Sequence, residues 1–172
     1  MPDQNILIAC IGNIFLGDDG FGVEVARALA ERGVPEDIKL VDFGIRGFDL
    51  AYALMDGYEV TIFVDATPRG QQPGTIYLIE PDLSELDDLP KQAMMIEPHG
   101  MNPMKVLGMA KAMGAEFKKI YLVGCEPAYT GEEDEGYMGL SEPVQAAVGE
   151  AVKMVEGLIA DIRADKTNVA TV

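Results

Sequence analysis

Three polar side chains that are distant in the chain have the types and positions expected of a cation site. Asp19 lies in a glycine-rich segment after a short apolar run, Asp65 directly follows another apolar run, and His99 is the only histidine. Carboxylate oxygens and imidazole nitrogens are ligands that divalent metal ions accept. A structural zinc site usually takes four protein ligands, several of them cysteine or histidine. This set of three therefore predicts an open site, which receives a metal together with the substrate or completes the coordination with water.

Each of these residues also has a purely structural interpretation. One member of the pair Asp18 and Asp19 could cap the helix that follows, but capping explains only one of the two. Asp65, taken alone, could start a turn. A lone histidine is more often structural than a ligand, although the position of His99 between a proline and a glycine favours exposure in a loop. The functional interpretation therefore depends on the three residues coming together in the fold.

The residues of the first glycine-rich segment exclude two kinds of nucleotide site. Gly12 and Gly17 have the separation of the two glycines in a phosphate-binding P-loop, which continues with lysine and serine or threonine. Asp18 and Asp19 stand there instead, and two carboxylates would repel a phosphate group. The glycine spacing of a dinucleotide-binding fingerprint is also absent. The segment presents carboxylates where a cation could bind.

A second glycine-rich segment, Asp42–Gly47, follows the next predicted strand. Its glycines suit a tight loop that approaches a partner closely. An ordinary strand-to-helix turn explains the same composition, and on composition alone it is the better explanation.

Short apolar runs alternate with helical patterns along the chain. Strands are predicted at 6–11, 38–43, 59–64, 75–79 and 120–124. Helices are predicted at 23–30 with a stop at Gly33, at 48–55, from a cap at Asn102 to Gly114, and from a cap at Ser141 through the apolar stripe 144–162. No element is assigned to 80–100, and 128–139 is predicted to be an acidic loop. The alternation predicts an α/β fold, a single-domain three-layer sandwich whose mostly parallel twisted sheet has about five strands with helices on both faces.

The expected fold gives the polar residues a common location. In open parallel sheets, ligands bind beyond the carboxyl ends of the strands, and Asp19, Asp42 and Asp65 all lie at or after the ends of predicted strands. One domain is expected to span residues 1–172, with the polar tail 163–172 frayed.

The charge balance narrows the range of partners. The 172 residues include 13 Lys and Arg against 29 Asp and Glu, which gives a net charge of −16. Such a chain repels phosphate backbones and anionic lipid, so we expect no nucleic acid and no membrane insertion, whereas a cationic or metal-bearing partner is easier to accommodate. No apolar stretch approaches the ~20 residues that cross a bilayer, and the first residues lack a basic signal region. The expected location is the cytoplasm, and Cys10 and Cys125, both within apolar runs, are expected to be buried and inert.

Five segments occur in an order that is typical of one known family. They are the run Gly12–Gly22, the boundary Val64–Ala66, the loop Pro98–His99, the run Val123–Pro127 and the segment Gly139–Ser141. Together they resemble the [NiFe]-hydrogenase maturation endopeptidases, and the resemblance extends from about Ile6 to Val155. These proteases remove a C-terminal extension from the precursor of the hydrogenase large subunit once nickel is in its active site. The resemblance therefore implies an endopeptidase whose partner is that precursor, whose nickel is carried by the substrate, and which needs no organic cofactor.

The resemblance also implies roles for individual residues. The family's metal-contacting carboxylates, which would also act in catalysis, map to Asp19 and Asp65, and its histidine maps to His99. The nickel could then serve as a recognition point, as a Lewis acid or as the activator of a water.

The family's loop after the second strand, usually Asp-Gly-Gly-Thr-x-Gly, maps onto Asp42–Gly47. Phe43 and Ile45 replace Gly and Thr in this chain, so the selection of the precursor is expected to differ. The residues expected to position the substrate are Asp42, Gly44, Arg46 and Gly47.

Two other functions are compatible with such a set of ligands. Receiver domains of signalling systems also combine paired acids after the first strand with an Asp after the third. They place the pair directly after the strand, however, and need a lysine after the fifth strand, where Cys125–Pro127 stands. A nickel-binding chaperone would need the three ligands without any cleavage. Labelling by a phosphodonor separates the first alternative from the endopeptidase, and the length of a nickel-loaded precursor after incubation separates the second.

Overall fold

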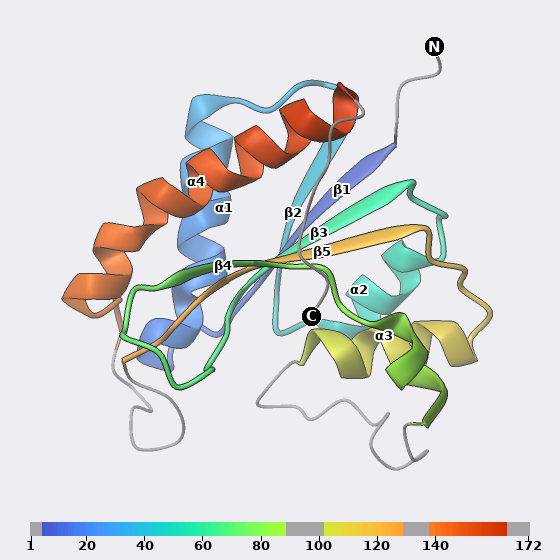
Figure 1. Ribbon diagram of the computed structural model, residues 1–172, viewed down its shortest axis with the longest axis horizontal. Helices are drawn as coiled ribbons and strands as arrows, with labels where there is room; N and C mark the ends of the chain where they lie inside the picture. The colour runs from blue at the N-terminus through green and yellow to red at the C-terminus, as the bar shows by residue number, and fades with distance from the viewer. Residues whose placement is uncertain (1–4, 89–101, 129–137, 165–172) are drawn as a thin grey trace.

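Figure 1 shows the computed structural model of the chain, of which residues 5–88, 102–128 and 138–164 are described. His99, the acidic run 132–135 and most of the tail that the sequence predicts to be frayed lie outside the described residues. Within these ranges, no helix is both long and apolar enough to cross a membrane.

The sheet has five strands in the order β2-β1-β3-β5-β4. The strand β1 (Ile6–Ile11) pairs in parallel with β2 (Ile38–Gly44) on one side and with β3 (Val60–Ala66) on the other. The strand β5 (Lys119–Cys125) continues the parallel part beside β3, and β4 (Ile76–Ile79) is an antiparallel edge strand. The prediction of a mostly parallel sheet of about five strands is therefore confirmed.

Two pairs of helices cover the two faces of the sheet (Figure 1). The helices α1 (Phe21–Arg32) and α4 (Glu142–Arg163) share one apolar core with the sheet, and α2 (Gly47–Leu54) and α3 (Pro103–Ala112) share the other. Every residue of β1 is buried, in alternation between the two cores. A strand that is covered on both faces needs no polar positions, which explains its continuous apolar run and confirms the three layers.

The connections of β1 and β3 to the intervening strand β2 run over opposite faces of the sheet. The helix α1 leads from β1 to β2 over one face, and α2 leads from β2 to β3 over the other. Where connections diverge in this way, the carboxyl ends of the two strands border a crevice. Gly22 allows α1 to start directly on these strands, because a Cβ there would lie 2.1 Å from the carbonyl oxygen of Ile11 and 2.6 Å from that of Val64.

The predicted helix caps have mixed outcomes. The Oδ1 atom of Asn102 accepts a hydrogen bond from the amide of Met104 at 2.9 Å, so this cap is confirmed. Ser141 stands at the N-cap position of α4, but its side chain does not cap the helix. Its hydroxyl instead donates to Asp18 at 2.8 Å. The predicted cap position at Ser141 is therefore confirmed, although its side chain bonds elsewhere. The interpretation of Asp18 as the cap of α1 is wrong, because the N-cap of that helix is Gly20.

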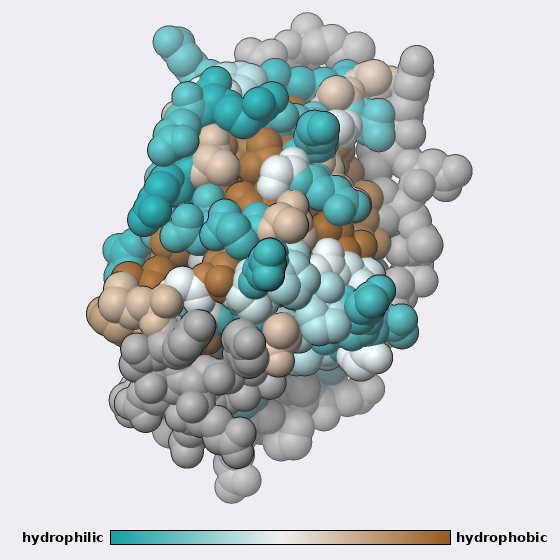
Figure 2. Space-filling view, turned by 90° about the vertical axis from the view of Figure 1, so that its left-hand side faces the viewer, coloured by the Kyte–Doolittle hydropathy of each residue, from teal (hydrophilic) through white to brown (hydrophobic). Residues whose placement is uncertain are grey.

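Two short 3-10 helices complete the described elements. The helix η1 (Gly17–Gly20) precedes α1, and η2 (Leu83–Asp88) lies within the stretch to which the sequence assigned no element. Arg163, which was expected to begin the frayed tail, is the last residue of α4. Figure 2 shows the side of the molecule that carries the beginning of α4, where hydrophilic residues surround smaller apolar patches.

Candidate active site

Asp19 lies in a loop that folds back on itself after β1. Its Oδ2 atom accepts a hydrogen bond from the amide of Asn13 at 3.0 Å. Gly12 makes this fold possible, because a Cβ at that position would lie only 2.2 Å from the carbonyl oxygen of Asp19. Burial raises the pKa of the Asp19 carboxyl, and the hydrogen bond from Asn13 opposes that shift. The loop therefore holds a half-buried carboxyl group that accepts a hydrogen bond from a main-chain amide.

Asp65 is the last residue but one of β3 and is only 6% exposed. Burial raises the pKa of its carboxyl well above the ordinary value, and the negative charge of Asp19 raises it further. The amide of Ala66 opposes these effects. The charge of Asp19 therefore acts on the carboxyl group of Asp65.

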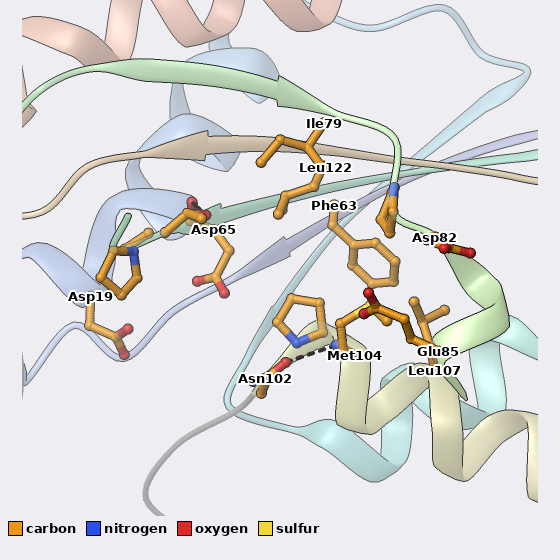
Figure 3. A pocket seen from close by; sticks show the side chains of 15 residues that line it. Asp19, Phe63, Asp65, Ile79, Asp82, Glu85, Asn102, Met104, Leu107 and Leu122 are labelled. Atoms are coloured by element: carbon orange, nitrogen blue, oxygen red, sulfur yellow. Dashed lines mark hydrogen bonds between the residues drawn. The ribbon is translucent and has the colours of Figure 1, made fainter. Parts of the chain in front are cut away.

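Figure 3 shows both carboxyl groups at the same end of one cavity. The cavity has a volume of about 450 Å³ and lies between the sheet and α3. The structure thus brings together two of the three residues predicted to bind a metal. The third, His99, lies outside the described residues, and the metal-binding role of all three stays a prediction.

A pair of carboxyl groups at one end of a cavity has two chemical uses. It can share a proton and act in acid–base catalysis, or it can bind a cation that relieves the repulsion between the two charges. In the described part of the chain, no group of three or more His, Cys, Asp or Glu side chains is arranged to hold a metal ion. Additional ligands for a cation at Asp19 and Asp65 would therefore come from the substrate, from water or from residues outside the described ranges.

Asp18, the neighbour of Asp19, has a structural role that the sequence did not indicate. Its carboxylate is fully buried and accepts hydrogen bonds from the amide of Ala128 at 2.8 Å and from the amide of Ser141 at 2.6 Å. It also accepts the bond from the Ser141 hydroxyl described above. Asp18 therefore joins the loop of Asp19 to the segment after β5 and to the beginning of α4.

Glu126 joins a second pair of segments at the same edge of the sheet. Its carboxylate accepts hydrogen bonds from the amide of Arg69 at 2.8 Å, from the amide of Gln71 at 2.9 Å and from the hydroxyl of Tyr77 at 2.7 Å. Burial alone would raise the pKa of Glu126, but these hydrogen bonds outweigh it and lower the pKa. Glu126 thereby fixes the loop that follows Asp65. The only sequence signal was a glutamate between the end of a buried strand and a proline.

The loop expected to position the substrate is stabilised largely by its own contacts. The guanidinium of Arg46 donates to the carbonyl oxygen of Asp42 at 2.6 Å, and the carboxylate of Asp42 accepts from the amide of Gly44 at 2.8 Å. Gly44 has a φ of +55°, a conformation that favours glycine, and its carbonyl oxygen accepts from the amide of Gly12. None of Asp42, Gly44, Arg46 and Gly47 lines the cavity, so the loop lies beside the loop of Asp19 and outside the cavity itself.

Both cysteines are buried and free, as the sequence predicted. Burial, followed by the charges of Asp18, Glu126 and Glu150, raises the pKa of Cys125 to about 12. Burial also raises the pKa of Cys10. Thiols in this state are poor nucleophiles.

Comparison with known proteins identifies one family. A family model described as hydrogenase maturation protease matches residues 23–158. A putative hydrogenase maturation protease of Methanocaldococcus jannaschii is 32% identical over 163 residues, which cover 92% of this chain and 99% of that protein. The hydrogenase expression/formation protein HoxM of Azotobacter vinelandii is 32% identical over 165 residues, which cover 94% of this chain and 75% of that protein.

Two solved structures are similar over nearly the whole chain. The hydrogenase maturating endopeptidase HybD from E. coli superposes with a TM-score of 0.69 at 25% identity and covers 94% of both chains. A hydrogenase 2 maturation peptidase from a Thaumarchaeota archaeon gives a TM-score of 0.68 at 30% identity and covers 91% of this chain and 99% of that chain.

Proposed function

Because the chain belongs to the family of hydrogenase maturation proteases, we propose that it removes the C-terminal extension from the nickel-loaded precursor of a [NiFe]-hydrogenase large subunit. The observation that carries this proposal is the pair Asp19 and Asp65, which lies at one end of a cavity at the carboxyl edge of the sheet. Hydrolysis of a peptide bond needs groups that can take up and release protons beside a space for the substrate chain. The carboxyl pair supplies the groups, and the cavity supplies the space.

The nickel of the precursor is the cation that this pair would contact. Two carboxyl groups that face one another across a site repel each other when both are ionised, and a divalent cation between them reverses that repulsion. Oxygen ligands are acceptable to nickel, and imidazole is a further acceptable ligand, so His99 is proposed as the third contact. The nickel belongs to the substrate, and cleavage would depend on the metal content of the precursor.

The carboxyl pair can perform the proton transfers of hydrolysis. A water attacks the scissile carbonyl carbon and gives one proton to an ionised carboxylate of the pair. The bond between carbon and nitrogen then breaks, and the leaving nitrogen takes up a proton. The products are a new carboxyl terminus on the large subunit and a free extension peptide. Proton transfers of this kind are typically worth about 10²–10⁴-fold in rate.

The loop Asp42–Gly47 is proposed to contact the precursor outside the cavity. Its carbonyl group at Gly44 is hydrogen-bonded to Gly12 of the loop that carries Asp19. A precursor that occupies the cavity would thus meet this loop next to the acid pair.

Mass spectrometry of the precursor tests the proposed function. The cognate precursor is prepared in nickel-loaded and nickel-free forms, and each is incubated with the protein. We expect the loaded form to lose its C-terminal extension and the nickel-free form to keep its full length.

Other outcomes would contradict the cleavage, the recognition through nickel or the role of His99. A loaded precursor of unchanged length contradicts the proposed cleavage and favours a nickel-binding chaperone. Equal shortening of both forms contradicts recognition through nickel. A His99→Ala variant that processes the precursor at the wild-type rate over a range of substrate concentrations removes His99 from the proposed contact set.

A further inference from the structure

We propose that the apolar part of the cavity is a specificity subsite. It binds an apolar side chain of the precursor, here called the client, at a residue next to the bond that is cut. This inference rests on the proposed function and concerns which client sequences the protein accepts. The subsite is formed by Phe63, Ile79, Leu122, Met104 and Leu107, all of which line the cavity.

The floor of the subsite is a row of three side chains on neighbouring strands. Phe63 of β3 pairs with Leu122 of β5, and Leu122 pairs with Ile79 of β4. Residues that are directly opposite on adjacent strands point to the same face of a sheet and contact one another. The row is therefore continuous across three strands, and Figure 3 shows it above the side chains that α3 contributes.

The acid pair stands at one end of this floor because of strand geometry. Phe63 and Asp65 are two positions apart in β3, and side chains at this spacing lie on the same face of a sheet. A client chain in extended conformation advances about 3.3–3.6 Å per residue. A client chain whose scissile bond lies at Asp65 therefore has an adjacent residue within reach of Phe63.

The composition of the cavity favours an apolar occupant. Met104 and Leu107 of α3 face the floor, and neither a lysine nor an arginine is among the described residues that line the cavity. Asp82 and Glu85 are the only acidic lining residues besides the catalytic pair in that described set, and both are exposed at the rim. The carboxylate of Asp82 accepts hydrogen bonds from Ser84. An acidic client side chain would meet repulsion from this rim, whereas an apolar one would be buried on the floor.

The cavity is large enough to hold a side chain and part of the backbone of a client. Pockets that bind drug-sized ligands have volumes of roughly 300–1,000 Å³, and this one has about 450 Å³. We assign the cavity to a client residue because Asp19 and Asp65 line the same cavity. A separate small apolar ligand is the competing occupant.

Precursor variants provide the first test. Leu, Ala, Asp and Lys are placed in turn at each of the two positions that flank the scissile bond of the nickel-loaded precursor, and kcat/KM is measured with the wild-type protein. We expect Leu to exceed Ala by about 10-fold or more at one of the two positions, in the range known for apolar pockets. Asp should be the poorest residue at that position. Equal values for Leu and Ala at both positions, or a preference for Lys, would overturn the subsite.

A substitution in the floor provides the reciprocal test, and the chain offers a matched control. Leu122→Phe fills the cavity and should reduce the ratio of kcat/KM for Leu over Ala several-fold. Leu78 of β4 is also half-buried but packs on the opposite face of the sheet. Leu78→Phe should leave the ratio at the wild-type value. An equal change of the ratio in both variants would contradict the assignment of the floor.

A binding measurement keeps the inference testable if Leu122→Phe fails to fold. Nickel-loaded precursors with Leu or Asp at the preferred position are titrated into the wild-type protein with labelled methionine methyl groups. We expect the Leu precursor to shift the resonance of Met104 and the Asp precursor to leave it in place. A shift with neither precursor, or an equal shift with both, would contradict the inference.

The outcomes separate this inference from the proposed function. A wild-type protein that cleaves no precursor contradicts the proposed function itself. A wild-type protein that cleaves all eight precursor variants with the same efficiency retains the function and refutes only the subsite.

Discussion

Four acidic residues lie at the carboxyl edge of the sheet, and they form two groups with opposite surroundings. Asp18 and Glu126 are buried and each accepts several hydrogen bonds from other segments of the chain. Asp19 and Asp65 line a cavity. Burial raises the pKa of both, and the charge of Asp19 raises that of Asp65 further. The first group joins segments that are distant in sequence, whereas the second lines a cavity.

Asp18 and Asp19 show how neighbouring residues come to differ in this way. Both lie in η1, a 3-10 helix, in which consecutive side chains point about 120° apart because a turn contains about three residues. One side chain consequently points toward the start of α4, and the other points into the cavity. Two adjacent carboxylates in a sequence therefore need not belong to one site.

The largest expected difference between the two groups is in catalysis. Asp65→Asn removes a carboxyl group from the cavity but keeps its shape, and Asp19→Asn does the same. We expect either change to reduce processing of the nickel-loaded precursor by about 10²–10⁴-fold while the thermal unfolding midpoint stays near or above that of the wild type. Precursor length by mass spectrometry and unfolding by circular dichroism measure the two effects. A variant that processes the precursor fully removes that residue from the mechanism.

The second difference is in stability. Asp18→Ala leaves the buried amide and hydroxyl of Ser141 and the partly buried amide of Ala128 without their acceptor. Each buried group costs about 1–3 kcal/mol, so we expect a loss of about 2 kcal/mol or more in the free energy of unfolding. Urea unfolding measures this loss. If Asp18→Ala were as stable as Asp19→Ala, Asp18 would not be the structural member of the pair.

Glu126 and Asp65, one residue from each group, should also respond to pH with opposite signs. The pKa of Glu126 is lower in the fold than its ordinary 4.5, so its contribution to stability is present above that pH and is lost as the pH falls through the folded-state pKa. The pKa of Asp65 is raised above 3.8, so the native state binds this proton more tightly and stability falls as the pH rises from that value.

Two variants measure this contrast by urea unfolding from about pH 3 to about pH 7. We expect Glu126→Gln to be less stable than the wild type by about 2 kcal/mol near neutral pH, because hydrogen bonds to a charged acceptor are lost, and the deficit should shrink in acid. Asp65→Asn should gain stability relative to the wild type as the pH rises. Parallel profiles for the two variants would contradict the distinction between the groups.

The smallest expected effect concerns the cap position of α4. Ser141→Ala removes the hydroxyl that donates to Asp18 and should cost about 1 kcal/mol. If the hydroxyl acts through Asp18, this cost disappears in an Asp18→Ala background. A full cost in that background, measured by a double-mutant cycle, would indicate that Ser141 acts on the helix itself.

The sequence predicted those elements whose signals are local. The uniform apolar run of β1 gave the bounds that the structure has, because a strand covered on both faces has no polar interruptions. The Asn102 cap was also predicted correctly, since its acceptor and its donor are two residues apart. The antiparallel direction of β4 was not predicted, because the apolar pattern of a short strand carries no information about its partner.

The parts of the site that the sequence missed depend on contacts across the chain. Asp18 binds groups that are 110 and 123 residues away, and Glu126 binds groups 49 to 57 residues away. The ends of the apolar runs indicated that Asp19 and Asp65 follow strands, and the fold brings the two residues together at one cavity. The cavity itself had no sequence signal, since its floor is a row across three strands that only the register reveals.

The close contact of Gly22 with the ends of β1 and β3 limits how this protein can change. The atoms that a methyl group would strike are two carbonyl oxygens of the main chain. A bulky neighbour can be trimmed by a second substitution, but a carbonyl group is present in every residue. No compensating mutation at Ile11 or Val64 can therefore make room for alanine, and any redesign of this edge has to keep a residue without a side chain at position 22.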